Sequence, residues 1–257
     1  MIRSLDHNLY FNGSLAYLTL DDDNDLYGPA DRTINKAMLG VHGDAETHLL
    51  NPGELYYSFE LTAGNLTIDD GQAFASFDEQ FVETEGSFIT LRYRLSHLMH
   101  LHGPFSTAVD LTGQVASGNL DTSQKFFIGG PYDVAGYPVS EASGDQGAMI
   151  KADLRYDMPE GFLSSDTQLT LFYARASTDI HKDPWAGWEG GNPLIRNRIT
   201  LKTAGVSSHS TWGGHYMLNL TVGRQVGDNL GRDPATENDS DQSDADYRAW
   251  AQFAYFF

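Results

Sequence analysis

Residues 148–157 read AMIKADLRYD, and their side chains alternate between apolar and polar along the whole segment. Successive side chains of a β-strand point to opposite faces of the sheet, so this pattern predicts a strand with one apolar and one polar face. The apolar face consists of Ala148, Ile150, Ala152, Leu154 and Tyr156.

The same period of two recurs in segments near residues 88–97, 105–116, 195–202 and 216–222. Such segments are about 10 residues long, which matches a tilted membrane-spanning strand rather than a strand of about 5–6 residues in a soluble protein. Their polar faces carry many charges, as the wet interior of a barrel does. We therefore predict an all-β fold, an antiparallel transmembrane β-barrel, with a soluble sandwich or barrel as the alternative.

Composition excludes several other classes of protein. The 257 residues include no cysteine, so neither a disulfide framework nor a thiolate metal site can form. The net charge of −19 argues against nucleic acid as a partner, because phosphate backbones are bound by clustered Lys and Arg. The first six residues lack the apolar core of an export signal, so we expect additional sequence upstream.

Turn signals divide the chain into about 11–12 strands. The connections 131–146, 158–165, 178–193, 207–211 and 226–244 alternate between long and short, and we expect the long ones to face outward, because bacterial barrels have short periplasmic turns. Traced backward, this order places residues 65–86 at the periplasmic end and the start of the chain outside. An odd number of strands, with the two ends of the chain on opposite sides, does not suit a single-chain bacterial barrel, and we therefore expect the C-terminal part of a longer barrel. The predicted strands lie near 7–20, 32–43, 54–64, 87–98, 104–116, 124–130, 147–157, 166–177, 194–206, 212–225 and 245–257.

The last predicted strand places aromatic side chains at alternate positions up to the terminal residue. Phe253, Tyr255 and Phe257 share one face, and this arrangement resembles the C-terminal signature of outer-membrane barrels. The resemblance implies that the barrel-assembly machinery recognises this strand.

From Gly86 onward the sequence resembles the transporter barrels of two-partner secretion, the haemolysin activation/secretion protein family. The similarity is densest in residues 118–132, 137–147 and 153–159. It implies a 16-stranded barrel in the Gram-negative outer membrane, preceded by two POTRA domains and a plug helix. Residues 1–257 would then be the C-terminal part of the barrel domain, without the POTRA domains and the first strands.

The same resemblance implies a function without a cofactor or catalysis. Such a pore exports an unfolded large exoprotein, a haemolysin or adhesin, while lipid and lipopolysaccharide surround the barrel. Alternatives are a passive porin-like channel and an inactive truncated barrel. We find no catalytic motif in the sequence. The acidic clusters at residues 21–25 and 237–241 are interpreted as solvated loops rather than Ca²⁺ sites, because neither has EF-hand spacing.

In this family the loop that corresponds to residues 131–146 folds into the lumen. Its tip carries a Val-Arg-Gly-Tyr type signature whose Arg meets an acidic residue in a Phe-x-Asp-x-Gly motif on the wall. The matching tip residues here are Val134, Ala135, Gly136 and Tyr137, and the matching wall residues are Phe172, Ala174 and Ala176. Both charged members are absent, which also leaves room for a shifted alignment or an inactive relative.

Alternation assigns further charged side chains to the lumen, where they would solvate a passing polypeptide through exchangeable contacts. These lumen-lining residues are Arg92, Arg94, Lys151, Asp153, Arg155, Arg196 and Arg198.

We hypothesise that Ala135 and Ala174 represent a coupled loss of an ion pair. A single buried charge without its partner costs about 3–5 kcal/mol, whereas losing both members can be nearly neutral. The change Ala135→Arg should therefore lower the free energy of unfolding, and Ala135→Arg combined with Ala174→Asp should not. Denaturant unfolding of the two variants measures this, and equal effects would reject the coupling.

Overall fold

The computed structural model describes residues 2–3, 6–24, 28–48, 51–69, 72–159, 164–192 and 194–257. Within these ranges one antiparallel sheet of 11 strands has the order β1-β2-β5-β6-β7-β8-β11-β12-β13-β14-β15. Its strands are β1 (Ile2–Arg3), β2 (His7–Leu20), β5 (Arg32–Thr47), β6 (Gly53–Ile68), β7 (Gly86–His100), β8 (Phe105–Ala116), β11 (Gln146–Asp157), β12 (Asp166–Asp179), β13 (Arg198–Trp212), β14 (Tyr216–Gln225) and β15 (Tyr247–Tyr255).

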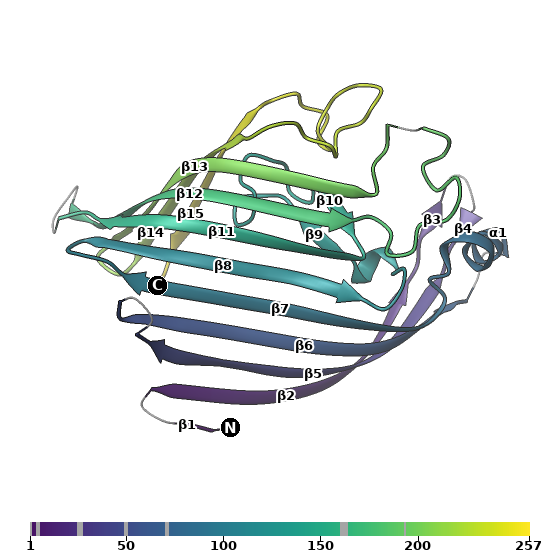
Figure 1. Ribbon diagram of the computed structural model, residues 1–257, viewed down its shortest axis with the longest axis horizontal. Helices are drawn as coiled ribbons and strands as arrows, with labels where there is room; N and C mark the ends of the chain where they lie inside the picture. The colour runs from purple at the N-terminus through teal and green to yellow at the C-terminus, as the bar shows by residue number, and fades with distance from the viewer. Residues whose placement is uncertain are drawn as a thin grey trace.

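The long strands follow one another in a simple up-and-down order. Short connections, 48–52, 101–104, 158–165 and 213–215, lie at one end of the sheet, on the left in Figure 1 together with both ends of the chain. Long connections, 21–31, 69–85, 117–145, 180–197 and 226–246, lie at the opposite end. Each long strand pairs with its successor without a crossover, which is the connectivity of an up-and-down barrel.

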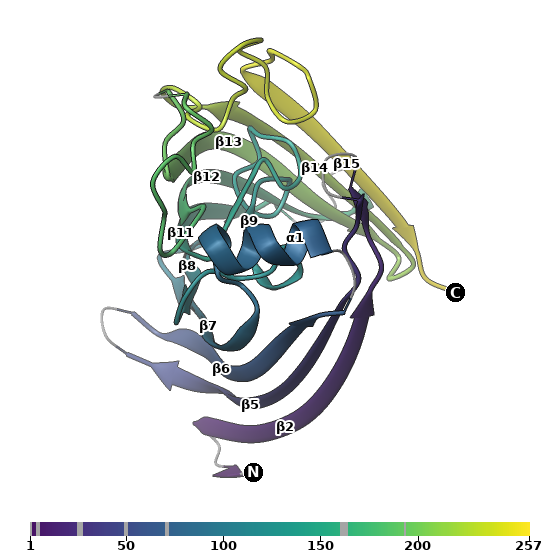
Figure 2. The same cartoon turned by 90° about the vertical axis from the view of Figure 1, so that its right-hand side faces the viewer.

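The sheet curls into a deep trough with a convex outside and a concave inside (Figure 2). The predicted all-β barrel class is confirmed, although β2 and β15 do not pair and the described sheet stays open. A barrel in lipid has no free edge, because unpaired backbone groups are costly there.

Smaller elements lie at the long-connection end and inside the trough. Two short pairs, β3 (Asp23–Asn24) with β4 (Gly28–Pro29) and β9 (Phe126–Ile128) with β10 (Ala142–Gly144), form separate sheets. Helix α1 (Gln72–Phe77) continues as the π-helical turn η1 (Asp78–Val82), and η2 (Thr122–Gln124) is a 3-10 turn. None of the described helices has the length and apolar character needed to cross a bilayer.

The predicted wall strand at residues 124–130 is wrong. Its residues form the short strand β9, which pairs with β10 and not with the wall. Removing one strand from the wall reverses the direction that we predicted for every earlier strand. Residues 65–86 therefore lie at the opposite end of the sheet from the predicted one. Their connection lies with the long connections, not at the predicted periplasmic end, and β2 begins at the same end as β15 finishes. The odd strand count is thereby corrected to ten long strands among the described residues.

Alternation separates the two faces of the wall sharply on β12. Leu169, Leu171 and Tyr173 on the convex face are 42–57% exposed. Phe172, Ala174 and Ala176 on the concave face are 3%, 0% and 0% exposed. The concave face of β12 is covered by other parts of the same chain, and these form the candidate site.

Candidate functional site

The segment between β9 and β10, residues 129–141, crosses the concave face of the sheet (Figure 2). Its tip buries Val134 and Tyr137, which share one apolar cluster with Ala174, Ala176 and Leu201 of the wall. Both tip side chains are 0% exposed. Full burial of side chains of this size contributes about 1.5–3 kcal/mol each, so the tip is a packed part of the structure.

Polar contacts fix the tip against β13 and β15. The Tyr137 hydroxyl donates to the Lys202 carbonyl at 3.0 Å. The Gly136 N–H donates to Thr203 Oγ1 at 3.1 Å, and Trp250 Nε1 donates to the Ala135 carbonyl at 2.8 Å. These bonds satisfy backbone groups that would otherwise be buried without partners.

Two glycines allow the tip to approach the wall backbone closely. A Cβ on Gly223 of β14 would lie 2.6 Å from the Ala135 carbonyl carbon and 2.7 Å from the Gly136 nitrogen. A Cβ on Gly136 would lie 2.8 Å from the backbone nitrogen of Gln225. Any larger residue at either position must displace backbone, which explains why the tip sequence keeps its Gly.

A buried carboxylate connects this tip to the β14–β15 connection. The Asp239 side chain is 0% exposed and forms ion pairs with Arg232 at 2.8 Å and Arg248 at 3.1 Å. Gln225 Nε2 donates to Asp239 Oδ2 at 2.9 Å and to the Gly136 carbonyl at 3.2 Å. Gln225 therefore joins the loop tip directly to the ion-paired centre.

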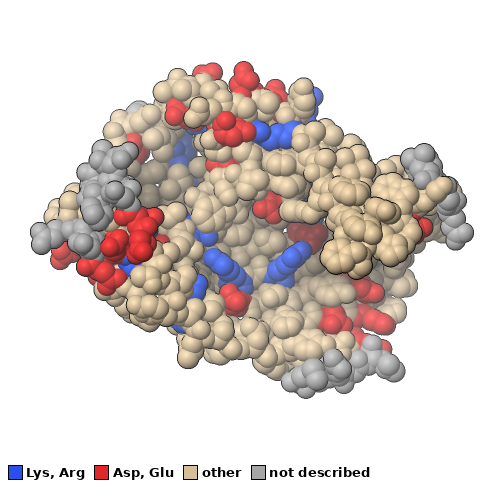
Figure 3. Space-filling view, turned by 180° about the vertical axis from the view of Figure 1, so that it is seen from behind, with Lys and Arg blue, Asp and Glu red and all other residues tan. Residues whose placement is uncertain are grey.

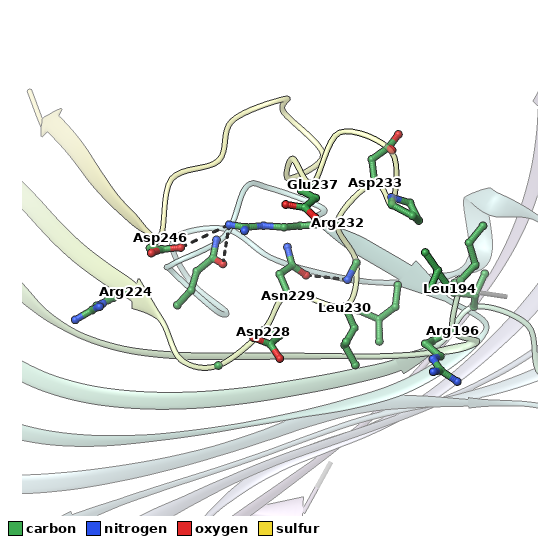
Figure 4. Close-up of a pocket in the computed structure, with 17 residues that line it drawn as sticks. Leu194, Arg196, Arg224, Asp228, Asn229, Leu230, Arg232, Asp233, Glu237 and Asp246 are labelled. Carbon is green, nitrogen blue, oxygen red and sulfur yellow. Dashed lines mark hydrogen bonds and ion pairs between the residues drawn. The ribbon is translucent and has the colours of Figure 1, made fainter. Parts of the chain in front are cut away.

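A second link runs from the other half of the loop. Asn229 Nδ2 donates to Glu141 and, at 2.9 Å, to Asp239 Oδ1. The Ser240 N–H donates to Glu141 Oε2 at 2.9 Å. Figure 4 shows Arg232 extending toward Asp246, with which it forms an outer ion pair of 3.7 Å. We call Gln225, Asn229, Arg232, Asp239 and Arg248 the Asp239 network.

Burial of the Asp239 carboxyl favours its neutral form, but hydrogen bonds from Arg232, Asn229, Arg248 and Gln225 outweigh burial and lower its pKa below the ordinary value. A lowered folded-state pKa means that the carboxylate stabilises the fold at neutral pH. This contribution is lost as the pH falls through the lowered pKa. The network therefore holds the loop at physiological pH.

Another buried carboxylate, Asp145, fixes the base of the same loop. Its side chain is 0% exposed and pairs with Lys125 Nζ at 2.7 Å. The Leu120 N–H donates to Asp145 Oδ1 at 3.1 Å, and the Lys182 N–H donates to Oδ2 at 2.7 Å. Asp145 thus connects residues before the loop with the β12–β13 connection.

The uncovered part of the concave face is lined by partly neutralised cations, and Figure 3 shows Lys and Arg side chains inside the hollow. Arg92 donates to Gln114 at 2.6 Å, and Arg94 lies 4.0 Å from Asp110. Asp153, 6% exposed, pairs with Arg155 at 3.0 Å and lies 3.9 Å from Lys151. Because all five predicted residues lie on this face, the hollow has a mixed charge.

Two of the predicted lumen-lining residues lie elsewhere. Arg198 is on the convex face, 70% exposed, and pairs with Asp179 at 2.7 Å. Ile199 and Leu201, expected on the lipid side, belong instead to the apolar cluster under the loop tip. Arg196 lies in the β12–β13 connection and lines a cavity of about 840 Å³ near the long-connection end of the sheet (Figure 4). The prediction for β13 was wrong because the loop requires an apolar wall beneath it.

The remaining predicted residues take mixed positions. Ala135 is buried but contacts β14 and β15, whereas Ala174 is opposite Thr203 on β13, so the proposed coupling of the two alanines stays a prediction. Phe253, Tyr255 and Phe257 are 64%, 53% and 107% exposed. The acidic cluster at 237–241 is not simply solvated, because it contains Asp239; Asp25 of the other cluster lies outside the described residues.

Sequence reasoning missed Gln225, Thr203, Trp250, Asp145 and Asp239. Thr203 and Gln225 occupy polar positions on strands. In the sequence, a polar side chain that faces water cannot be distinguished from one that makes a buried contact. The only sequence signal for Asp239 as an ion-paired residue was its charge. Its partners Arg232 and Arg248 can be identified only from the structure, in which β15 directs the Arg248 side chain to the concave face.

Comparisons with known proteins give a consistent picture. The sequence pattern of the haemolysin secretion/activation protein ShlB/FhaC/HecB family matches residues 29–175. The heme/hemopexin transporter protein HuxB of Haemophilus influenzae strain KW20 / Rd is 27% identical over 230 residues, 89% of this chain and 39% of HuxB. HuxB of strain 86-028NP is 27% identical over 199 residues, 77% of this chain and 34% of HuxB.

Among solved structures, CdiB from Escherichia coli superposes with a TM-score of 0.70 at 14% identity, over 100% of this chain and 43% of CdiB. At this identity the likeness supports the fold alone. The chain spans less than half the length of these relatives.

The Asp239 network predicts that two nearby carboxylates, Asp239 and Asp241, contribute very different amounts to the free energy of unfolding. Asp239→Asn leaves Arg232 and Arg248 without their buried counter-charge and should lower the free energy of unfolding by about 3–5 kcal/mol. Asp241→Asn removes only a half-exposed partner of Arg248 and should cost less than about 1 kcal/mol. Urea unfolding in detergent at pH 7 measures both, and equal losses would contradict a central role for Asp239.

Proposed function

Since this chain belongs to the haemolysin secretion/activation protein family, as its resemblance predicted, we propose that it forms part of an outer-membrane pore for two-partner secretion. The family is a secretion family rather than an enzyme family. The proposed cargo is an unfolded exoprotein, which crosses along the concave face of the sheet. We propose a haemolysin or adhesin as this cargo.

The observation that carries this proposal is a polar hollow with an internal loop docked across it. Arg92, Arg94 and Lys151 present cations, while Asp110 and Asp153 partly neutralise them. Arg94 is 69% exposed and lies 4.0 Å from Asp110, so this pair gains little energy and exchanges readily with polar groups of a moving chain. A surface of this kind solvates an extended polypeptide without holding it.

The internal loop gives the pore a second property expected of a protein exporter. Asp133 on the loop lies within the field of the wall cations Lys151 and Arg94. Burial raises the pKa of Asp133, while the two cations oppose that rise. The loop is therefore matched to the wall in charge as well as in shape, and it narrows the passage that an open channel would leave.

Location in the outer membrane follows from the same proposal. The convex face carries Leu15, Leu39, Leu171, Val206 and Phe253, each more than half exposed, as a lipid-facing band requires. With the long connections outward, the C-terminal strand ends at the periplasmic side. A passive porin-like channel is the competing function.

A secretion assay separates these functions. The protein should release a co-produced exoprotein partner into the medium, and a passive channel would leave that partner in the periplasm. Arg94→Glu, on the concave face, should lower the amount released, because it removes a lumenal cation. Arg198→Glu is the matched control on the convex face, with the same charge change and almost equal exposure, 70% against 69%.

Release that is equal in all samples, or that also occurs without the transporter, would contradict the proposal. Surface labelling of an epitope in an outer connection confirms that each variant reaches the membrane in equal amounts.

A further inference from the structure

Three cations cluster on the convex, lipid-facing side of the wall, where a charge is least expected. Arg175 of β12 is directly opposite Lys202 of β13 in the strand register. Arg224 of β14 is opposite Ala204, diagonal to Lys202. Diagonal neighbours across antiparallel strands lie about 7–8 Å apart, so the three side chains can reach one common ligand.

No carboxylate of the described residues forms an ion pair with any of these three cations. Asp179, on the same face of β12, is already bound by Arg198 through two hydrogen bonds of 2.7 and 2.8 Å, and Asp246, which lines a cavity together with Arg224, forms an ion pair with Arg232 at 3.7 Å. Like charges directly opposite each other destabilise a sheet. In a chain with a net charge of −19, a cationic group without a counter-charge suggests that an external anion completes it.

The position of the cluster along the strands defines the depth of that anion. Arg175 is four residues before the end of β12, Lys202 is four residues after the start of β13, and Arg224 precedes the last residue of β14. All three therefore lie near the long-connection end, at the level of an outer-leaflet headgroup. Toward that end, the Thr200 hydroxyl donates to the Ser177 hydroxyl at 3.2 Å, which adds polar groups to the same surface.

Directly below the cations the surface becomes an apolar groove. Beyond the row of Tyr173, Ala204 and Arg224, the next row consists of Leu171, Val206 and Val222, and in the row after it Leu169 and Leu220 are on either side of Ser208. Together with Leu154 and Phe105 they line a shallow hollow of about 450 Å³. The hollow extends across the convex face from β8 to β14, on the side of the cations that faces the middle of the wall.

We propose that this surface is a binding site for a lipid with more than one phosphate on its headgroup, the lipid A part of lipopolysaccharide. One phosphate would bind between Arg175 and Lys202, another would reach Arg224, and an acyl chain would occupy the groove. Cations near a membrane surface favour the binding of anionic lipid, and two phosphates would engage all three cations. The inference rests on the proposed membrane location but not on protein export.

The test measures lipid binding by the complete protein purified in detergent. Bisphosphorylated lipid A is titrated, and bound lipid is counted by native mass spectrometry. The double variant Arg175→Gln with Lys202→Gln should bind about tenfold more weakly or worse than the wild type. The double variant Arg94→Gln with Arg198→Gln, with the same loss of charge at positions outside the cluster, should bind as the wild type does.

Two further arms identify what is recognised. Lipid A without phosphates should bind weakly to all variants, and excess inorganic phosphate should compete only poorly, because it lacks the acyl chains. Equal affinity of both double variants, or equal binding of the phosphate-free lipid, would overturn the proposal. Heat-dependent gel migration verifies that each variant is folded, and unchanged exoprotein release by the cluster variant keeps this result separate from the proposed export.

Discussion

Strict alternation of side chains along antiparallel strands is the constraint on which the whole structure depends. In the described wall each long strand pairs residue by residue with its successor, so one residue on the concave face fixes the orientation of all its neighbours. The placement of Ala174, Thr203 and Arg248 under the loop follows from this register. So does the placement of Arg175 and Lys202 outside. A slip of one residue in β13 would turn Thr203 outward and Lys202 inward, and would so disrupt both sites.

Within the trough, buried charge rather than apolar area decides where the loop lies. The tip presents one Tyr, one Val and two small residues, which alone would fit many apolar walls. Asp239 and Asp145 are each fully buried with a cation, and each binds a different side of the loop connection. A buried ion pair tolerates little displacement, because separating the two groups leaves both charges buried without a partner. The family-type contact between an Arg at the tip and an acid on the wall is absent here, and we propose that the Asp239 network takes over its positioning role.

The sequence predicted the inward and outward faces of a strand correctly only where the internal loop does not change which face is apolar. β12 was predicted correctly, because Leu169, Leu171 and Tyr173 face outward and Phe172, Ala174 and Ala176 face inward. β13 was not, because the loop makes the inside apolar at Ile199 and Leu201, while Arg198 and Lys202 face outward near the membrane edge. Residues 124–130 were taken for wall since β9 has strand composition, yet its partner β10 lies inside. Hydrophobic alternation shows that the two faces of a strand differ. It does not show which face contacts water when a loop fills the interior of the barrel.

The most direct measurement compares two adjacent residues on β14. A spin label at Val222, 46% exposed on the convex face, should in liposomes respond to oxygen dissolved in lipid. A label at Thr221, whose side chain points to the concave face, should respond to a water-soluble nickel chelate instead. This opposite response is what a lipid-facing outside and a watery inside predict. Equal access of both labels to the aqueous reagent, with no oxygen effect at Val222, would contradict a membrane wall.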